Sequence, residues 1–316
     1  MPLTQLNFQP GIDTENTPTG AEGRWIDCDK VRFRKGLPQK IGGWTKFSTA
    51  YYVGVGRALE QWFALDGSRY EALGTDRKVY AYVAGTNQDI TPIRSTDALV
   101  NAISTITNSN IITITDTAHG ATKGDFITLS SVSTAVAGIP AATLDAEYEI
   151  LNISNADAYT IQSSATANAN TGPTANCTIN YQLNIGPSVQ TFGFGWGAGS
   201  WNAGTWNTPR TTSQITLDAR LWSINNWGED LVITEKDGGT YEWDLSLGMS
   251  TNRATAIANA PTTSTLSLVS TETRHVVCMG TETAIANTAT QDKMFIRWSD
   301  QENYNQWTPN VTNSAG

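Results

Sequence analysis

The chain has 316 residues, a formal net charge of −9, only 16% charged residues, eleven Trp and ten Tyr. This composition, with abundant small polar residues and little Glu, Lys or Leu, is typical of β-sheet proteins and argues against a helical fold. The absence of a long apolar run excludes a transmembrane helix. Met1–Pro10 has neither the basic nor the apolar region of a signal peptide. The negative net charge argues against tight binding of DNA.

The three cysteines, Cys28, Cys177 and Cys278, lie far apart and are odd in number. This pattern does not suit a disulfide framework. We therefore expect reduced, buried thiols in a protein made in a cytoplasm.

The N-terminal part reads as an extended arm followed by a basic hairpin. Residues 1–23 are rich in Pro, Thr, Gly and Asn, which suits a segment lying on another surface. In the next strand Lys30, Arg32 and Arg34 alternate with apolar residues and so share one face. Lys35 begins the turn and Lys40 lies on the return strand. These five cations are candidate contacts to a DNA channel or to a neighbouring subunit; the alternative is a solvated strand paired with nearby carboxylates.

A composition change marks residues 97–184 as an inserted module. Only one Lys or Arg occurs from Ser95 to Pro209, whereas seven acidic residues occur from Asp97 to Asp157. Apolar alternation predicts about six short strands, which would form a small β-barrel or sandwich. The clearest strands are 111–115, 126–130, 148–153, 159–162 and 177–183, and the polar stretch 163–176 is expected to be a loop.

Residues 193–206 carry four aromatic rings separated by glycine and other small residues. Such a segment suits neither a helix nor a regular strand interior. We expect Trp196, Trp201 and Trp206 either to fill an interface between subunits or to cap the core of the domain. Stacking of the rings on sugars is a third reading.

The clearest repeat unit is Leu217–Leu245, in which three strands are separated by two turns, the second at 237–239. Weaker versions occur at 69–83 and 294–309. Repeated units of about 40–50 residues suggest the four-stranded blades of a β-propeller. We therefore predict an all-β chain in which 24–96 and 185–316 form the propeller. About four blades fit this length, so we expect the propeller to be incomplete or to be closed by another chain.

The sequence offers little for catalysis. His119 and His275 lie in different modules, and the acidic pairs Glu229/Asp230 and Glu242/Asp244 lie beside turns or on outer strand faces, where turn geometry and solubility explain them. No phosphate-binding loop is present. We expect no catalytic residues, no metal site and no cofactor.

The run GRWIDCDKVRFRKGLPQKIGGW (23–44) resembles the start of tail nozzle, or packaged-DNA stabilisation, proteins of short-tailed bacteriophages. Further matches are the Gly/Trp segment with Thr208-Pro209-Arg210, and the segments 90–93, 221–222, 227–231, 297–300 and 307–309. The inserted module more weakly resembles small β-barrels found in many phage structural proteins, through 118–120 and 124–125. Together the matches cover most of the chain outside the insertion.

The resemblance implies a homohexameric ring of propeller subunits in the virion tail, without catalysis. This ring would extend the DNA-exit channel below the portal and its adaptor, retain and then release the packaged genome, and let double-stranded DNA pass without reading its sequence. Tail fibre, needle or plug proteins and the host cell envelope would be further partners, and assembly would take place in the bacterial cytoplasm. The alternative is a tail-associated propeller that binds a carbohydrate or receptor.

Overall fold

The computed structural model describes the chain except residues 1–8, 44, 47, 49, 191–217 and 250–251. The chain is all-β, and it divides into two compact units, 1–49 and 50–316. In the described residues, helix is limited to the short α1 (Ala141–Leu144) and two 3₁₀ turns, η2 (Leu245–Leu247) and η3 (Thr288–Thr290). No helix of this described part is long and apolar enough to cross a membrane.

The first unit is built on the expected hairpin. Strands β1 (Val31–Arg34) and β2 (Leu37–Lys40) pair antiparallel through a two-residue turn. Lys35 and Gly36 both have positive φ, 51° and 78°, which is the turn geometry that matches the twist of paired strands. The observed division places residues 24–49 with the N-terminal arm, whereas we expected the propeller to begin at residue 24.

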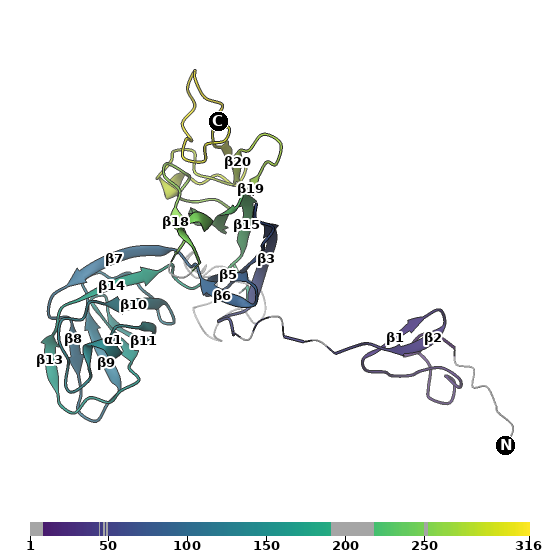
Figure 1. Cartoon of the computed structure of the whole chain (residues 1–316), viewed down its shortest axis with the longest axis horizontal. Helices are drawn as coiled ribbons and strands as arrows, with labels where there is room; N and C mark the ends of the chain where they lie inside the picture. The colour runs from purple at the N-terminus through teal and green to yellow at the C-terminus, as the bar shows by residue number, and fades with distance from the viewer. Residues whose placement is uncertain (1–8, 44, 47, 49, 191–217, 250–251) are drawn as a thin grey trace, which may run out of the picture. The chain divides into compact units, whose positions relative to one another are not determined.

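The second unit contains three antiparallel sheets outside the insertion (Figure 1). The first sheet is β3 (Gly56–Phe63), β4 (Arg69–Thr75), β5 (Val79–Val83) and β6 (Thr86–Asp89). The second is β15 (Trp222–Trp227), β16 (Asp230–Glu235), β17 (Thr240–Trp243) and β18 (Thr255–Ala256). The third is β19 (Leu266–Val269), β20 (Val276–Met279) and β21 (Ile296–Trp298).

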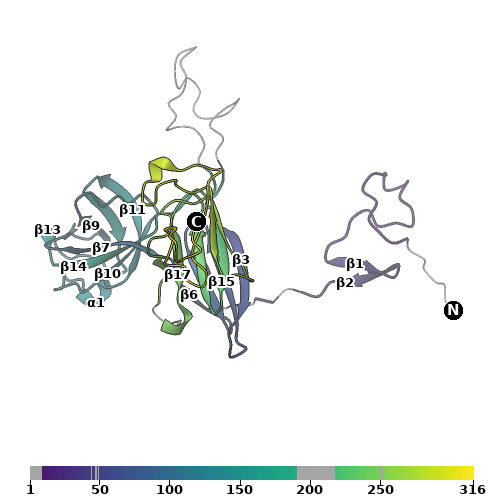
Figure 2. The same ribbon diagram turned by 90° about the horizontal axis from the view of Figure 1, so that it is seen from above.

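The three sheets stack face to face like consecutive propeller blades. Strand β15 contacts both β3 and β19, so the first strands of the three sheets lie side by side, and Figure 2 shows β3 next to β15. We expected about four blades from the chain length. The described residues form three sheets, because much of 281–316 forms turns rather than strands.

Two apolar layers hold this stack together. Between the first and second sheets, Trp62 meets Trp243 edge to face with the ring centroids 6.3 Å apart. Trp222 approaches the first sheet at Gly74, where a Cβ would lie 2.6 Å from its ring. Between the second and third sheets, Trp227 and fully buried Trp307 belong to a separate cluster. The second sheet is therefore covered on both faces.

The turn between β16 and β17 depends on Asp237 and Gly238. Asp237, not a glycine, has the positive φ of 59°. Gly238 is needed for close approach instead, since a Cβ there would lie 2.8 Å from the Glu235 side chain.

The insertion is a single curved sheet of eight strands in the order β13-β8-β9-β12-β11-β10-β14-β7. Strand β11 takes part in both halves of the sheet and carries two register shifts, which bend it. The strands are β7 (Ile93–Leu99), β8 (Ile103–Thr105), β9 (Ile111–Thr115), β10 (Phe126–Ser130), β11 (Glu147–Asn155), β12 (Ala158–Gln162), β13 (Thr171–Thr174) and β14 (Cys177–Gln182).

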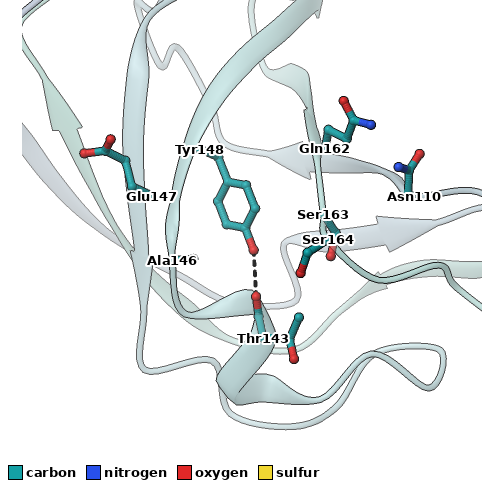
Figure 3. A pocket seen from close by; sticks show the side chains of 8 residues that line it. All are labelled: Asn110, Thr143, Ala146, Glu147, Tyr148, Gln162, Ser163 and Ser164. Atoms are coloured by element: carbon teal, nitrogen blue, oxygen red, sulfur yellow. Dashed lines mark hydrogen bonds between the residues drawn. The ribbon is translucent and has the colours of Figure 1, made fainter. Parts of the chain in front are cut away.

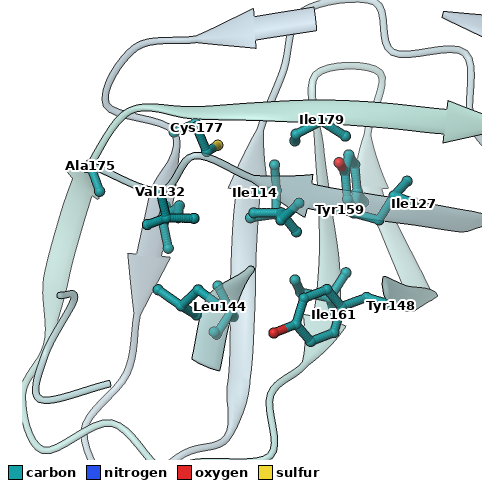
Figure 4. Close-up of a cluster of buried hydrophobic side chains, with 14 of the residues drawn as sticks. Ile114, Ile127, Val132, Leu144, Tyr148, Tyr159, Ile161, Ala175, Cys177 and Ile179 are labelled. Carbon is teal, nitrogen blue, oxygen red and sulfur yellow. The ribbon is translucent and has the colours of Figure 1, made fainter. Parts of the chain in front are cut away.

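The interior of this inserted domain is a compact apolar core (Figure 4). Ile114, Ile127, Tyr159 and Ile179 point into it from four strands and are fully buried. The small β-barrel or sandwich is thus confirmed, with two corrections. The sheet has eight strands instead of six, and the stretch 163–176, expected to be a loop, contains β13.

Candidate functional site

The basic hairpin keeps its cations accessible but divides them between two faces. Residues directly opposite each other in an antiparallel pair share a face. Because Arg32 pairs with Gln39 and Arg34 with Leu37, both arginines lie on one face. Lys40 pairs with Val31 and so belongs to the other face. Because side chains alternate between the two faces of a strand, the sequence alone already implies this division of the cations between the faces.

The apolar side of the hairpin is packed within its own unit. Trp25 meets Phe33 edge to face, with the ring centroids 6.3 Å apart. On the basic side, the Arg32 Nε–H donates to Gln39 Oε1 at 3.0 Å. Lys30 Nζ lies 3.7 Å from Asp29 Oδ2, and both side chains are largely exposed. A pair this exposed contributes little to stability, so the hairpin presents a cationic, solvated face.

The candidate interface aromatics Trp196, Trp201 and Trp206 lie outside the described residues. Their expected role therefore stays a prediction.

A cluster of charged residues that the sequence did not indicate joins the inserted domain to the sheet stack. Lys78, only 3% exposed, precedes β5 and reaches Asp89 Oδ2 at 2.8 Å and the carboxylate of Glu147. Arg253 lies 3.0 Å from Asp89 and 3.4 Å from Glu147. Gln182 Nε2 donates to Glu147 at 2.6 Å. We call Lys78, Asp89, Glu147 and Arg253 the junction network.

The first sheet, the second sheet and the inserted domain each contribute to the junction network. Lys78 and Asp89 come from the first sheet, Arg253 comes from the segment before β18 of the second sheet, and Glu147 begins β11 of the inserted domain. Two cations and two carboxylates balance in charge. A buried arrangement of this kind is strongly destabilised when one member is removed, because the remaining charge loses its partner. The network therefore fixes the orientation of the inserted domain.

The pKa of Asp89 reflects this environment. Burial alone raises the pKa of its carboxyl, but Lys78 and Arg253 outweigh the burial and hold that pKa below the ordinary value. Asp89 is therefore ionised at neutral pH, and its charge is part of the folded state.

Further contacts support the same junction. The Arg77 guanidinium lies 2.6 Å from Glu149, donates to the Gly124 carbonyl at 3.0 Å, and is centred 4.9 Å from the Phe126 ring. Asp125 accepts a hydrogen bond from the Ile185 backbone N–H at 2.8 Å, where the chain leaves the inserted domain. The exit of the chain is thus held by a directed contact, and Arg77 ties the first sheet to the inserted domain.

Inside the inserted domain, a polar chain is closed from solvent. The Tyr181 hydroxyl donates to Asp116 at 2.6 Å, and the Tyr159 and Tyr181 hydroxyls are 2.9 Å apart. Burial raises the pKa of both tyrosines far above the ordinary value, so both remain protonated at neutral pH. His119 packs edge-on against Tyr159, and its Nδ1 accepts from the Ala121 N–H at 3.0 Å. These groups serve packing and turn geometry.

Three of the four carboxylates in the acidic pairs, those of Glu229, Asp230 and Asp244, accept backbone hydrogen bonds at turns. Glu229 accepts a hydrogen bond from the Leu65 N–H at 2.6 Å, and Asp230 accepts one from the Leu245 N–H at 2.9 Å. Asp244 accepts one from the Ser246 N–H at 2.8 Å and begins η2. His275 in turn bonds through Nδ1 to the Ser299 carbonyl at 2.8 Å.

Glu242 differs from these turn carboxylates, since its carboxylate Oε2 has no hydrogen-bond partner within the described residues. Among the described residues, no three His, Cys, Asp or Glu side chains lie close enough together to hold a metal ion.

The inserted domain also carries an open hollow of about 510 Å³ beside α1 (Figure 3). The Tyr148 hydroxyl donates to the Thr143 carbonyl at 2.9 Å at its floor, while Figure 3 shows Glu147 directed away from Gln162 and Asn110. Hydroxyl and amide groups dominate the lining, which comprises Asn110, Thr143, Ala146, Glu147, Tyr148, Gln162, Ser163 and Ser164. Tyr148 is only 8% exposed and offers little ring face for stacking.

No family model and no curated protein matches this sequence. Among solved structures, a protein described as "Phage phi92 endosialidase" aligns with 83% of this chain and 38% of its own length, at 13% identity and a TM-score of 0.25. The chain thus spans well under half of that protein. A TM-score this low carries no conclusion about fold or function.

Proposed function

We propose that the chain is a structural subunit of a short bacteriophage tail, a nozzle ring protein that extends the DNA-exit channel and acts by shape instead of by chemistry. The observation that carries this proposal is the resemblance of residues 23–44 to tail nozzle proteins. The ring is a homohexamer below the portal and adaptor, and it meets a fibre, needle or plug protein at its far end.

Two features of the molecule support a mechanical role. The junction network and the contacts of Arg77 and Asp125 fix the inserted domain to the sheet stack, as a part under mechanical stress requires. The titratable groups weighed as catalytic residues mostly hold turns by accepting backbone hydrogen bonds. A channel wall must be rigid and must not bind DNA tightly. The negative net charge of this chain meets the second requirement, because it repels DNA.

Particles assembled without this chain test the proposal. We expect such heads to be filled and then to lose their genome, so that the DNA becomes sensitive to added nuclease, and we expect supply of the purified chain to restore protection. Stable, fully protected heads that fail only in attachment to the host cell would contradict a nozzle role.

A second candidate function is recognition of a carbohydrate on the host cell. The polar hollow of the inserted domain favours it, because hydroxyl and amide groups suit a polyol ligand. Glycan-array binding by the purified chain, lost in Gln162→Ala and retained in Gln61→Ala on β3, would support this alternative. Absence of binding to any glycan would exclude it.

A further inference from the structure

The inserted domain ends in two sheet edges that are built differently. Its eight-stranded sheet runs from β13 to β7 (Figure 1), and among the described residues each of these two strands pairs with one neighbour only. The outer backbone groups of an edge strand can pair with a strand of another molecule, so folded proteins usually block their edges. The two edges of this sheet therefore need separate explanations.

The edge at β13 is blocked by its backbone. This strand has only four residues, contains Gly172 and Pro173, and pairs with β8 through a register shift between Thr171 and Thr174. Proline has no N–H to donate, and a shift in register bends the strand. A further strand therefore finds no regular row of backbone groups at β13.

The edge at β7 has a regular backbone. This strand has seven residues without glycine or proline, and its pairing with β14 is uninterrupted from Ser95 to Leu99. Val100 follows and is 73% exposed. Short segments of high β-propensity without proline pair readily with copies of themselves unless a charge prevents it. The backbone of β7 alone would thus not keep a further strand away.

Asp97 supplies a charge in the middle of this edge strand, and it is the only charged residue from Ser95 to Thr115. It lies opposite fully buried Ile179 on β14, so its side chain is on the core side of the sheet. Among the described residues the Asp97 carboxylate has no hydrogen bond or ion pair. The guanidinium of Arg94, near the start of the strand, donates to the His119 carbonyl at 2.8 Å instead. No internal contact therefore explains a carboxylate at this position.

The open edge makes this position tolerable for a charge. Asp97 stays only half-buried, since no strand of the described residues covers the outer side of β7. A strand added on that side would remove water from an unpaired carboxylate, which is strongly unfavourable. Asp97 is therefore compatible with β7 as an edge strand and incompatible with β7 as an interior strand.

Pairing between two copies of β7 would also bring like charges together. In a full-length antiparallel pair with two-fold symmetry, the middle residue Thr96 lies opposite Thr96 of the second copy. Asp97 then lies opposite Ser95 of the second copy, and the two Asp97 side chains occupy diagonal positions about 7–8 Å apart. Like charges at this separation repel each other, and they do so more strongly where water is excluded.

We propose that Asp97 keeps the edge of β7 unpaired. Its carboxylate blocks one more strand beside β7, as the proline and the register shift do at β13. Without Asp97 the segment 95–115 would carry no charge, and its open edge would pair with that of a second copy. The inference concerns the inserted domain alone and does not rest on the proposed function.

The full chain with Thr96→Cys tests the proposal. Cross-strand residues at the centre of two paired β7 strands have a Cα separation that suits a disulfide. Mild oxidation of Thr96→Cys is compared with oxidation of Thr96→Cys combined with Asp97→Val. Non-reducing gels give the rate, and mass analysis of the linked peptides separates links at position 96 from links through the partly exposed Cys28. We expect the link at position 96 to form at least about tenfold faster with Asp97→Val, because covering a carboxylate weakens association by more than that factor.

Two controls carry the same Thr96→Cys reporter. Asp97→Glu keeps the charge and should stay unlinked. Thr113→Val adds the same apolar side chain on β9, which has a neighbouring strand on both sides, and should also stay unlinked. Urea unfolding should show Asp97→Val to be at least as stable as the wild type, since valine can pack beside Ile179. Should Asp97→Val fail to fold, Asp97→Asn removes the charge at nearly the same shape and gives the same comparison.

Three results would overturn the inference. Equal linking rates with and without Asp97 would show that its charge does not protect the edge. Association of Asp97→Val without a link at position 96 would place the contact on another surface. Rapid linking of Thr96→Cys in the presence of Asp97 would mean that the edge of β7 is already paired in the native protein. Each result concerns β7 alone, so it is distinct from the genome-retention test of the tail role.

Discussion

Replacement of Lys78 by Met should loosen the inserted domain from the sheet stack. Lys78 is 3% exposed, contacts Asp89 and Glu147, and lies 4.2 Å from the centre of the Phe126 ring. Met preserves the apolar stem and removes the charge, which leaves two carboxylates near each other. Breaking a buried ion pair in this way costs about 3–5 kcal/mol.

The expected loss for Lys78→Met lies at the low end of that range. Arg253 still contacts both carboxylates, Gln182 still bonds Glu147, and the Thr91 N–H still bonds Asp89. A loss of about 3 kcal/mol corresponds to a fall in Tm of roughly 6–12 °C for a unit of this size. Urea unfolding, followed by near-UV circular dichroism and by limited proteolysis at the inserted domain, gives the measurement.

The matched control is Lys236→Met. Lys236 pairs with Asp218 at 2.6 Å, but the two side chains are 25% and 43% exposed. Water screens such a pair, so the expected loss is below about 1 kcal/mol. A double-mutant cycle of Lys78→Met with Glu147→Gln should also give a coupling of about 1–3 kcal/mol. Equal losses for Lys78→Met and Lys236→Met, with no coupling to Glu147, would refute the structural role of the junction network.

The remaining predictions concern pH, thiol reactivity and packing. The pKa of Asp89 is depressed in the folded protein, so the ionised carboxylate stabilises the fold fully above the pKa of an unfolded carboxyl, about 3.9, and this stabilisation is lost as pH falls towards the folded pKa. The difference in urea midpoint between wild type and Asp89→Asn should therefore shrink over that pH range. A difference that stays constant with pH would contradict this prediction. Burial raises the pKa of Cys278 to about 11, whereas Cys28 is partly exposed. At neutral pH a chromogenic disulfide reagent should therefore modify Cys28 in the native protein and Cys278 only after denaturation. Rapid modification of Cys278 in the native protein would argue against its burial. Gly74→Ala should destabilise by about 1–3 kcal/mol, since its Cβ would lie 2.6 Å from Trp222, and an unchanged urea midpoint would show that the sheets are not packed this closely.

Local patterns predicted most of the strands. The alternation in 30–34 followed by Lys35-Gly36 gave the hairpin, and the apolar run 126–130 coincides with β10. Both signals are contained within a few residues, where side-chain period and turn chemistry decide the backbone. Cys177 and Cys278 are buried free thiols as expected, whereas Cys28 is only partly buried.

The features that the sequence did not predict depend on partners far along the chain. Strand β13 contains Gly172 and Pro173, which disfavour strands, yet it pairs with β8 as an edge strand. Lys78 and Glu147 are 69 positions apart, so no local pattern marks their contact. The arrangement of the junction network follows only from the folding of the inserted domain against the first sheet.

Electron microscopy of purified virions, at a resolution that traces the chain, tests the central claim most directly. The account predicts density for this chain as a six-fold ring on the tail axis, with the inserted domain held against its sheet stack. A five-fold position on the capsid, or a peripheral position on a receptor-binding appendage, would contradict it.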